Sequence, residues 1–216
     1  MGELLLLRHG ETEWSLSGRH TSYTDLPLTG HGERQAAALA SVLANRDIAL
    51  VLTSPLHRAV RTARLAGLAD AHPDYDLHEW DYGGYEGITT AEILRDRPDW
   101  NLWIDGVAPG SVEHPGESPD QIGARADRVL AHIDPFLTAE ATGDVILVAH
   151  AHFLRVLTAR RLGLPPAAGS LFALDTGALS RLGTEHGRPV IRAWNASAAP
   201  LPSLIPTPHL DRNNAP

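Results

Sequence analysis

Two short segments without a single polar side chain, residues 4–7 and 145–149, constrain the fold of this chain most strongly. Apolar runs of this length, without polar alternation, are typical of strands that are buried on both faces of a parallel sheet. Segments with helical periodicity lie between the apolar runs, and this alternation favours helices packed on both faces of one sheet. We therefore predict an α/β fold of three layers around a mostly parallel central sheet.

Periodicity and capping residues place the other elements. Further strands are expected over residues 48–52 and 75–78, and a closing hairpin or edge pair over 179–183 and 190–194. Helices are expected at about residues 30–44, after Thr53-Ser54-Pro55, and over 89–97, 118–138 and 152–162. In the second of these helices, Ser54 would be the N-cap and Pro55 the first helical residue. We expect one catalytic domain over residues 1–195 and a proline-rich tail over 196–216.

Neither lysine nor cysteine occurs in the 216 residues, and all 18 basic side chains are arginines. Without lysine no Schiff base can form, and a P-loop would lack the side chain that contacts the phosphates. Without cysteine, thiol nucleophiles, disulfides and zinc–thiolate sites are excluded. Covalent chemistry is left to hydroxyl, carboxylate and imidazole groups, and 12 histidines are many for a chain of this length.

The formal net charge of −8 makes nucleic acid and anionic membrane surfaces poor partners for the chain as a whole. No apolar run approaches the roughly 18 residues of a membrane span. The run at residues 4–7 is also too short for a signal peptide, so we expect a cytoplasmic protein. Homo-oligomerisation is left open by the sequence.

Polar side chains that directly follow predicted strands are the candidate site, because ligands of open α/β sheets bind beyond the carboxyl ends of the strands. Arg8 and His9 follow the first strand, and His150 follows the strand over residues 145–149. Arg58 falls in the first turn of a helix after the second strand, and Glu79 follows the third. Arginine is suited to clamp a phosphate through its planar guanidinium, so the set predicts a site for a phosphate group.

These residue types suggest phosphoryl transfer through a histidine nucleophile. A neutral His9 imidazole would attack phosphorus, and a phosphohistidine would divide one displacement into two. Arg8, Arg58 and a protonated His150 would stabilise charge on the equatorial oxygens. Glu79 is the candidate acid that protonates the leaving oxygen and then activates water.

Several longer segments resemble the signature of the histidine phosphatase superfamily, which includes the cofactor-dependent phosphoglycerate mutases. They occur in family order over about the first 155 residues. The segments are Leu6-Leu7-Arg8-His9-Gly10-Glu11-Thr12, Gly18-Arg19-His20-Thr21, Thr24-Asp25-Leu26-Pro27-Leu28-Thr29 with Gly32, Thr53-Ser54-Pro55-Leu56-His57-Arg58-Ala59, Glu79-Trp80-Asp81-Tyr82-Gly83 with Tyr85-Glu86-Gly87, Gly116-Glu117-Ser118, and Val148-Ala149-His150-Ala151. Arg-His-Gly alone would be weak, whereas the ordered set is specific.

The resemblance implies a doubly wound sheet, a phosphohistidine at His9, and Glu79 as the proton donor. It assigns Arg8, Arg58 and His150 to the phosphate pocket, and it implies neither a metal nor an organic cofactor. Candidate substrate-binding residues are Ser15, Arg19, His20, Thr21, Ser22, Ala151 and His152. Ser15 stands where the family often has a phosphate-binding asparagine, and a serine hydroxyl reaches less far.

Three functions remain open at this point: a phosphomonoester hydrolase acting on small phosphorylated metabolites, a phosphoglycerate mutase, and a non-catalytic protein that binds phosphorylated ligands. The mutases carry extra basic residues in an insertion that here spans about residues 87–117. Its only basic side chains are Arg95, Arg97 and His114. A less basic pocket would release product and admit water, which favours hydrolysis, including broad-specificity or sugar-phosphate hydrolysis.

Alternative interpretations exist for several site residues. Glu86 and Asp81 are rivals of Glu79 for the role of the acid. His150 and His152 could form a metal-binding pair, although no carboxylate cluster is spaced to complete such a site.

Overall fold

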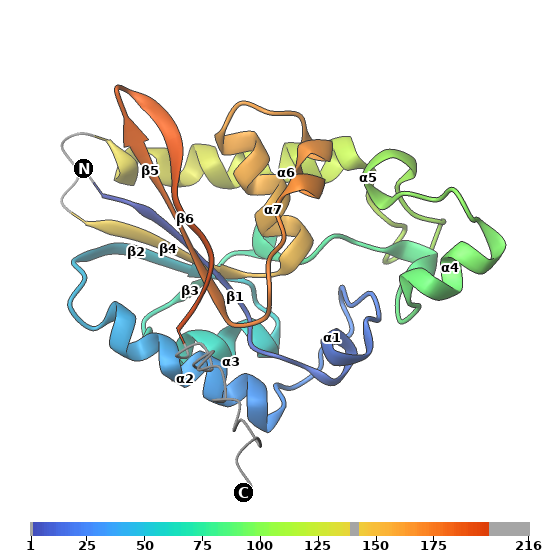
Figure 1. Cartoon of the computed structure of the whole chain (residues 1–216), viewed down its shortest axis with the longest axis horizontal. Coiled ribbons are helices and arrows are strands. Elements are labelled where there is room, and N and C mark those ends of the chain that lie inside the picture. Colours follow the sequence, from blue (N-terminus) through green and yellow to red (C-terminus); the bar gives the residue numbers. More distant parts are fainter. Residues whose placement is uncertain (1, 139–142, 199–216) are drawn as a thin grey trace, which may run out of the picture.

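A six-stranded sheet forms the centre of the computed structural model, which describes residues 2–138 and 143–198 (Figure 1). The strand order is β3-β2-β4-β1-β5-β6. The strands are β1 (Leu4–Arg8), β2 (Ile48–Thr53), β3 (His72–Pro73), β4 (Asp144–Ala149), β5 (Ala178–Glu185) and β6 (Arg188–Ser197). The pairs β1–β4, β4–β2 and β2–β3 are parallel, whereas β5 is antiparallel to β1 and to β6. The mostly parallel sheet and the closing antiparallel pair are confirmed.

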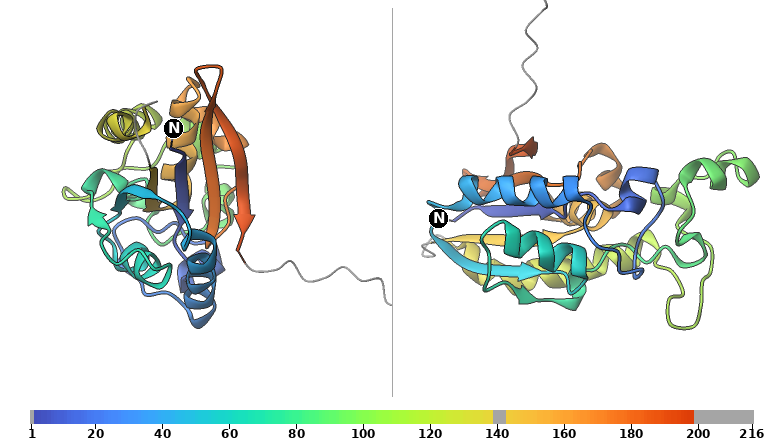
Figure 2. Two further views of the ribbon diagram at one scale, coloured as in Figure 1. Left: turned by 90° about the vertical axis from the view of Figure 1, so that its left-hand side faces the viewer. Right: turned by 90° about the horizontal axis from the view of Figure 1, so that it is seen from below.

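Helices cover both faces of the sheet, which gives the predicted three layers (Figures 1 and 2). On one face lie α2 (Gly30–Leu43) and α3 (His57–Leu65); on the other lie α6 (Pro119–Ile133) and α7 (Ala151–Arg161). Side chains of β1 alternate between the two cores: Leu5 and Leu7 pack with α2 and α3, and Leu4 and Leu6 with α6 and α7. Burial on both faces explains why this strand has no polar position.

Shorter helices connect these layers. They are α1 (Glu13–Ser17), α4 (Thr90–Asp96) and α5 (Leu102–Asp105), with the 3-10 helices η1 (Tyr75–Leu77), η2 (Gly83–Tyr85), η3 (Asp134–Leu137) and η4 (Pro166–Leu171). Figure 1 shows α1, α4 and α5 gathered beyond the end of the sheet at which β1 finishes. This places the connecting segments around the carboxyl ends of the parallel strands.

Three local predictions were wrong. Residues 75–78 form no strand, because β3 ends at Pro73 and the Asp74 carboxylate then accepts the Asp76 N–H, which closes the turn of η1. Helix α3 begins at His57, after Leu56 as N-cap, so Ser54 and Pro55 precede it. The long helix that begins after Ser118 ends at Ile133 rather than 138, where Pro135 follows in a 3-10 turn.

The division at residue 195 falls inside a strand. β6 continues through Ser197, so the first two residues of the predicted tail extend the sheet. Most of the predicted tail, from residue 199 onward, lies outside the described residues. Within residues 2–138 and 143–198, no helix is long and apolar enough to cross a membrane.

Candidate active site

A cavity of about 190 Å³ opens beyond the carboxyl end of β1. It is smaller than the roughly 300–1,000 Å³ of sites for drug-sized ligands, which suits a small metabolite. Its lining includes nine of the twelve predicted site residues: Arg8, His9, Ser15, Arg19, His20, Thr21, Glu79, Ala151 and His152. Thr12, Gly18, Tyr82 and Thr90 complete it.

His9 is buried directly after β1, and its ring has a defined tautomer. Nδ1 lies 2.7 Å from the carbonyl oxygen of Gly10, which can only accept, so Nδ1 carries the proton. The lone pair of the ring is therefore left on Nε2. Burial, and then the charges of Arg58 and Arg8, hold the pKa of His9 well below 6.5. The imidazole is neutral at neutral pH, as a nucleophile requires.

Arg58, in the first turn of α3, is fully buried and spends its donors on the protein. Its guanidinium donates to the carbonyl oxygens of Thr21, Ser22 and Thr24 at 3.3, 2.8 and 3.0 Å. Its Nε donates to Nδ1 of His150 at 3.2 Å. Arg58 is not among the residues that line the cavity, and its bonds to three carbonyls fix the loop after residue 20, so one guanidinium N–H is left for the predicted contact with phosphate.

His150 lies at the end of β4, with its ring centroid 5.1 Å from that of His9. Because Nδ1 accepts from Arg58, the single proton of the neutral ring is on Nε2, 2.8 Å from the hydroxyl oxygen of Ser54. Burial, and then the charge of Arg58, hold the pKa of His150 well below 6.5. The geometry therefore favours a neutral His150 over the predicted protonated one. Neither does it line the cavity.

Glu79 lies in the cavity wall at 5% exposure, with its carboxylate at the start of α7. Oε1 accepts the N–H groups of Trp80 and Phe153 at 2.8 and 2.9 Å. Oε2 accepts only the His152 N–H, at 3.1 Å. Of the two oxygens, Oε2 has the free lone pair that can carry and transfer a proton.

The two rival carboxylates have other partners. Glu86 accepts the N–H groups of Ser22 and Thr24, and Asp81 accepts those of Gly83 and Gly116. Both line a separate cavity with Tyr23 and His114. Among the three candidates for the acid, Glu79 alone lines the cavity that contains His9.

Arg8 supplies the cation closest in sequence to His9. Its NH1 donates to the carbonyl oxygen of Leu174 at 2.6 Å, whereas its buried Nε has no partner among the described residues. A buried guanidinium N–H without an acceptor is costly, and an anion in the cavity would remove that cost. Arg19, also in the lining, is exposed.

Three neutral polar rings also line the cavity, those of His20, Tyr82 and His152. The Tyr82 hydroxyl lies 2.6 Å from Nδ1 of His152, and His20 Nδ1 donates to the Ile88 carbonyl at 2.7 Å. Burial lowers the pKa values of His20 and His152 and raises that of Tyr82, so all three are uncharged at neutral pH. Such groups can hydrogen-bond hydroxyls of a substrate without attracting a second anion.

Of the remaining residues predicted to contact substrate, Ser15, Thr21 and Ala151 line the cavity and Ser22 does not. The Ser15 hydroxyl donates to the Thr12 carbonyl and accepts the Thr12 N–H, so it is used in the capping box of α1. The Ser22 N–H donates to Glu86, and the Ser22 carbonyl accepts from Arg58.

Sequence reasoning gave no functional role to Tyr82 or Arg125. Tyr82 was visible only as part of a motif, but it lines the cavity. Arg125 is buried on α6, on the face that carries Ile122, Ala126 and Val129. An arginine within the apolar stripe of an amphipathic helix was the signal that could have revealed it.

The metal-pair interpretation of His150 and His152 has no support in the geometry. Nδ1 of His150 faces Arg58, and Nδ1 of His152 faces Tyr82. In the part of the chain that the structure describes, no group of three or more histidine, aspartate or glutamate side chains could hold a metal ion.

An α/β sheet with a neutral imidazole, a buried carboxylate and two arginines in one cavity at its carboxyl edge defines a class: enzymes of phosphoryl transfer. The sequence model of the family described as "Histidine phosphatase superfamily (branch 1)" matches residues 4–197. The chain belongs to this superfamily. The match covers every predicted catalytic residue.

Individual relatives agree with this assignment. An acid phosphatase of Mycobacterium tuberculosis is 40% identical, covering 92% of this chain and 95% of the relative. The sedoheptulose 1,7-bisphosphatase of Saccharomyces cerevisiae is 37% identical, and the match covers 74% of this chain and 67% of the relative. A "Probable phosphoglycerate mutase GpmB" of Yersinia enterocolitica is 32% identical over 98% and 96%. The solved structure of an open reading frame product of Mycobacterium tuberculosis matches with a TM-score of 0.84 at 39% identity, covering 92% and 99%.

The predicted class of enzyme is thereby confirmed. The chain is a histidine phosphatase, a phosphoric monoester hydrolase that acts on small phosphorylated molecules through a phosphohistidine. Its fold is the phosphoglycerate mutase-like α/β fold.

Proposed function

We propose that His9 is the nucleophile and Glu79 the acid and base of a phosphatase for small phosphorylated metabolites. One observation carries the proposal: the neutral His9 ring, with its lone pair on Nε2, shares a cavity with Glu79, whose Oε2 accepts a single hydrogen bond. In the first step Nε2 forms a bond to phosphorus and the bond to the leaving oxygen breaks, while Oε2 of Glu79 gives that oxygen a proton. In the second step water attacks phosphorus, Oε2 takes a proton from it, and the N–P bond breaks.

Arg8 is the residue that would bind the equatorial oxygens directly, through the Nε that has no other acceptor in the described chain. Arg58 and His150 are not part of the cavity lining, and His150 lies next to His9. One guanidinium N–H of Arg58 and the Nε2–H of His150 are the groups that they could turn toward a bound phosphate. Of the other four N–H groups of Arg58, three hold carbonyl oxygens and Nε holds Nδ1 of His150. An anion there would also raise the pKa of His150 toward its usual range.

The three basic residues of the 87–117 segment are engaged away from the cavity of His9, and this favours hydrolysis over transfer of the phosphate to a second position of the substrate. Arg95 pairs with Glu92 at 3.7 Å, and Arg97 donates to the Tyr85 hydroxyl at 2.9 Å. His114 stacks on Tyr23, with centroids 3.8 Å apart. None of these basic side chains lines the cavity of His9, so they offer no second anion site for a phosphoglycerate to turn in.

The neutral wall formed by His20, Tyr82 and His152 supports a substrate with hydroxyl groups beside its phosphate, such as a sugar phosphate. The relative named for sedoheptulose 1,7-bisphosphate acts on a compound of this kind. Arg19 at the cavity wall is the group that would bind any further anionic substituent.

The test compares His9→Ala and Glu79→Gln with the parent, using p-nitrophenyl phosphate, sugar phosphates and phosphoglycerate. We expect phosphate release by the parent with negligible mutase turnover, and no release or phosphoenzyme in His9→Ala. Mutase turnover above hydrolysis in the parent, or labelled phosphate trapped on His9→Ala, would overturn the proposal. A cytoplasmic location and a homo-oligomer are further proposals, tested by cell fractionation and light scattering.

A further inference from the structure

The segment that carries Glu79 leaves the sheet before it reaches the cavity. β3 ends at Pro73, and its two residues pair only with Leu52 and Thr53. After the single turn of η1, residues 78–82 belong to no strand or helix. Ladder hydrogen bonds therefore cannot fix the backbone at Glu79, although a general acid must be placed within about 0.5 Å of its working position.

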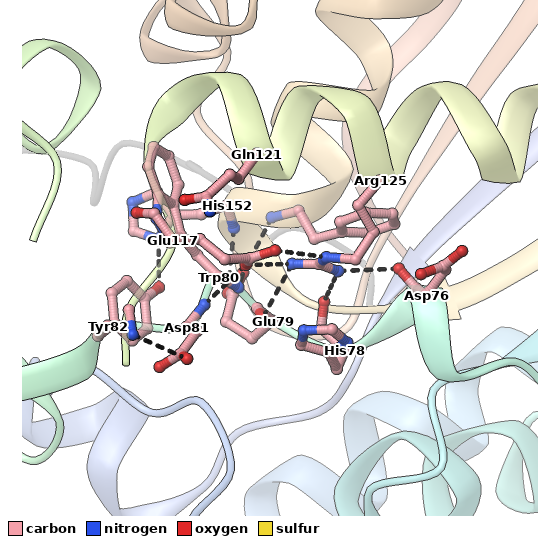
Figure 3. Close-up of polar contacts among 12 residues, drawn as sticks. Asp76, His78, Glu79, Trp80, Asp81, Tyr82, Glu117, Gln121, Arg125 and His152 are labelled. Atoms are coloured by element: carbon pink, nitrogen blue, oxygen red, sulfur yellow. Dashed lines mark hydrogen bonds and ion pairs between the residues drawn. The ribbon is translucent and has the colours of Figure 1, made fainter. Parts of the chain in front are cut away.

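A buried guanidinium from α6 replaces the missing neighbour strand (Figure 3). NH1 of Arg125 donates to the carbonyl oxygens of Asp76 and His78 at 2.8 and 2.6 Å. NH2 donates to the carbonyl oxygen of Glu79 itself at 3.2 Å. Arg125 is 3% exposed, so water does not compete for these acceptors.

Glu117 completes the attachment from the other side. Its carboxylate binds Arg125 through two bonds, Nε to Oε1 at 2.8 Å and NH2 to Oε2 at 2.6 Å. Oε2 also accepts the Asp81 N–H at 2.9 Å, and the Glu117 carbonyl accepts the indole N–H of Trp80 at 2.8 Å. The pair therefore fixes the residues on both sides of Glu79 (Figure 3).

Arg125 also contacts the partner of the Glu79 carboxylate. Its guanidinium carbon lies 4.7 Å from the centroid of the Phe153 ring, and the Phe153 N–H donates to Oε1 of Glu79. One side chain thus packs against both the backbone of Glu79 and the start of α7 that holds its carboxylate.

We propose that Arg125 and Glu117 are positioning residues for the acid–base step. The inference rests on the proposed role of Glu79. A buried ion pair is weak evidence for stability, because desolvation offsets most of the attraction. Every hydrogen bond that these two side chains make outside the pair, among the described residues, goes to the segment that bears Glu79, so the geometry points to placement of Oε2 as its function.

Leaving-group dependence separates positioning from a general structural role. Phenyl phosphate has a leaving oxygen that needs a proton, whereas 2,4-dinitrophenyl phosphate releases a stable anion. Misplacing the acid should therefore lower kcat/KM for the first ester and little for the second. A loosened fold or a damaged His9 would lower both together.

The variants are Glu79→Gln, Arg125→Lys, Glu117→Gln and the control Arg128→Met. Arg128 lies one turn further along α6 and contacts the same segment, but through an ion pair with the Asp76 carboxylate at 60% exposure. For phenyl phosphate we expect Glu79→Gln to lose about 10²–10⁴-fold in kcat/KM. Arg125→Lys and Glu117→Gln should lose about 10²-fold, the cost of a shift of roughly 1 Å at a catalytic group.

The control should match the parent with both esters, and circular dichroism verifies folding at the assay temperature. Equal losses on both esters in Arg125→Lys and Glu117→Gln, or no loss, would overturn the positioning role. If Arg125→Lys does not fold, Glu117→Gln decides alone, since its amide oxygen can still accept the Asp81 N–H. If Glu79→Gln itself shows no leaving-group dependence, the proposed acid is wrong and this inference fails with it; if only the pair fails to show it, Glu79 keeps its role.

Discussion

Two buried threonines offer a measurement of one hydrogen bond next to the nucleophile. Thr62 on α3 and Thr158 on α7 are both fully buried, and each hydroxyl donates to the carbonyl four residues earlier, at 2.7 and 2.8 Å. They differ in one respect: the Thr62 hydroxyl also accepts the N–H of Gly10, at 3.1 Å. Gly10 directly follows His9, and its carbonyl sets the tautomer of that ring.

Replacing each threonine by valine removes the hydroxyl and keeps the branched shape. In Thr158→Val the freed carbonyl belongs to a helix and keeps its backbone partner. In Thr62→Val the buried Gly10 N–H loses the only acceptor that the described residues give it, which costs about 1–3 kcal/mol. We expect Thr62→Val to lose this much more unfolding free energy than Thr158→Val, or ~2–4 °C of melting temperature for each kcal/mol.

Urea unfolding followed by circular dichroism measures both variants against the parent. A kcat/KM assay should show a further loss in Thr62→Val only, because the Gly10 carbonyl would no longer hold Nδ1 of His9 in place. Equal unfolding free energies for the two variants would refute the reasoning, since the orphaned N–H is what distinguishes the hydrogen bonds that the two hydroxyls make.

Two more predictions concern protons and metals. His9 and His150 have pKa values well below 6.5 in the folded state, so below pH 6.5 the unfolded chain binds more protons than the folded chain. The unfolding free energy is therefore unaffected by these two groups above pH 6.5. As the pH decreases from 6.5 toward the folded pKa, each histidine lowers the unfolding free energy by up to about 1.4 kcal/mol per pH unit. Unfolding free energies from urea titrations that stay flat between pH 7.5 and 5.5 would contradict this. Dialysis against EDTA should leave phosphatase activity unchanged, because none of the residues in the proposed steps is a metal ligand; restoration of lost activity by a divalent cation would count against the mechanism.

Much of the site was readable from the sequence because strand ends are local features. Arg8 with His9, and His150, stand at the ends of short apolar runs, and such runs are typical of strands that are buried on both faces. Parallel strands bring their carboxyl ends to one edge, so residues far apart in the chain could be assigned to one site. Glu79 was correctly placed at this edge even though the strand predicted before it does not exist.

The partners of these residues were not readable. Arg58 was expected to clamp phosphate, but most of its donors hold carbonyls of the loop at residues 21–24, more than 30 positions away. His150 was expected to be a cation, but Arg58, 92 positions away, donates to its Nδ1 and fixes it as a neutral ring. The position of Arg125 in the apolar stripe of its helix indicates burial, but nothing near it in sequence shows that three carbonyls approach it.

The sequence by itself determined the layers of the fold and the chemical types gathered at one edge, because apolar periodicity and the residues at strand ends depend on near neighbours in the chain. Only the tertiary structure decided which donor meets which acceptor, and hence the tautomers of His9 and His150 and the hydrogen bonds of each Glu79 oxygen. Hydrogen bonds among buried groups are settled by competition between segments that fold together, and burial itself sets the charge state of each imidazole. A chain without lysine or cysteine thus specified arginine, histidine and glutamate for its chemistry, and the packing of α3, α6 and α7 against the sheet assigned each of them its partners.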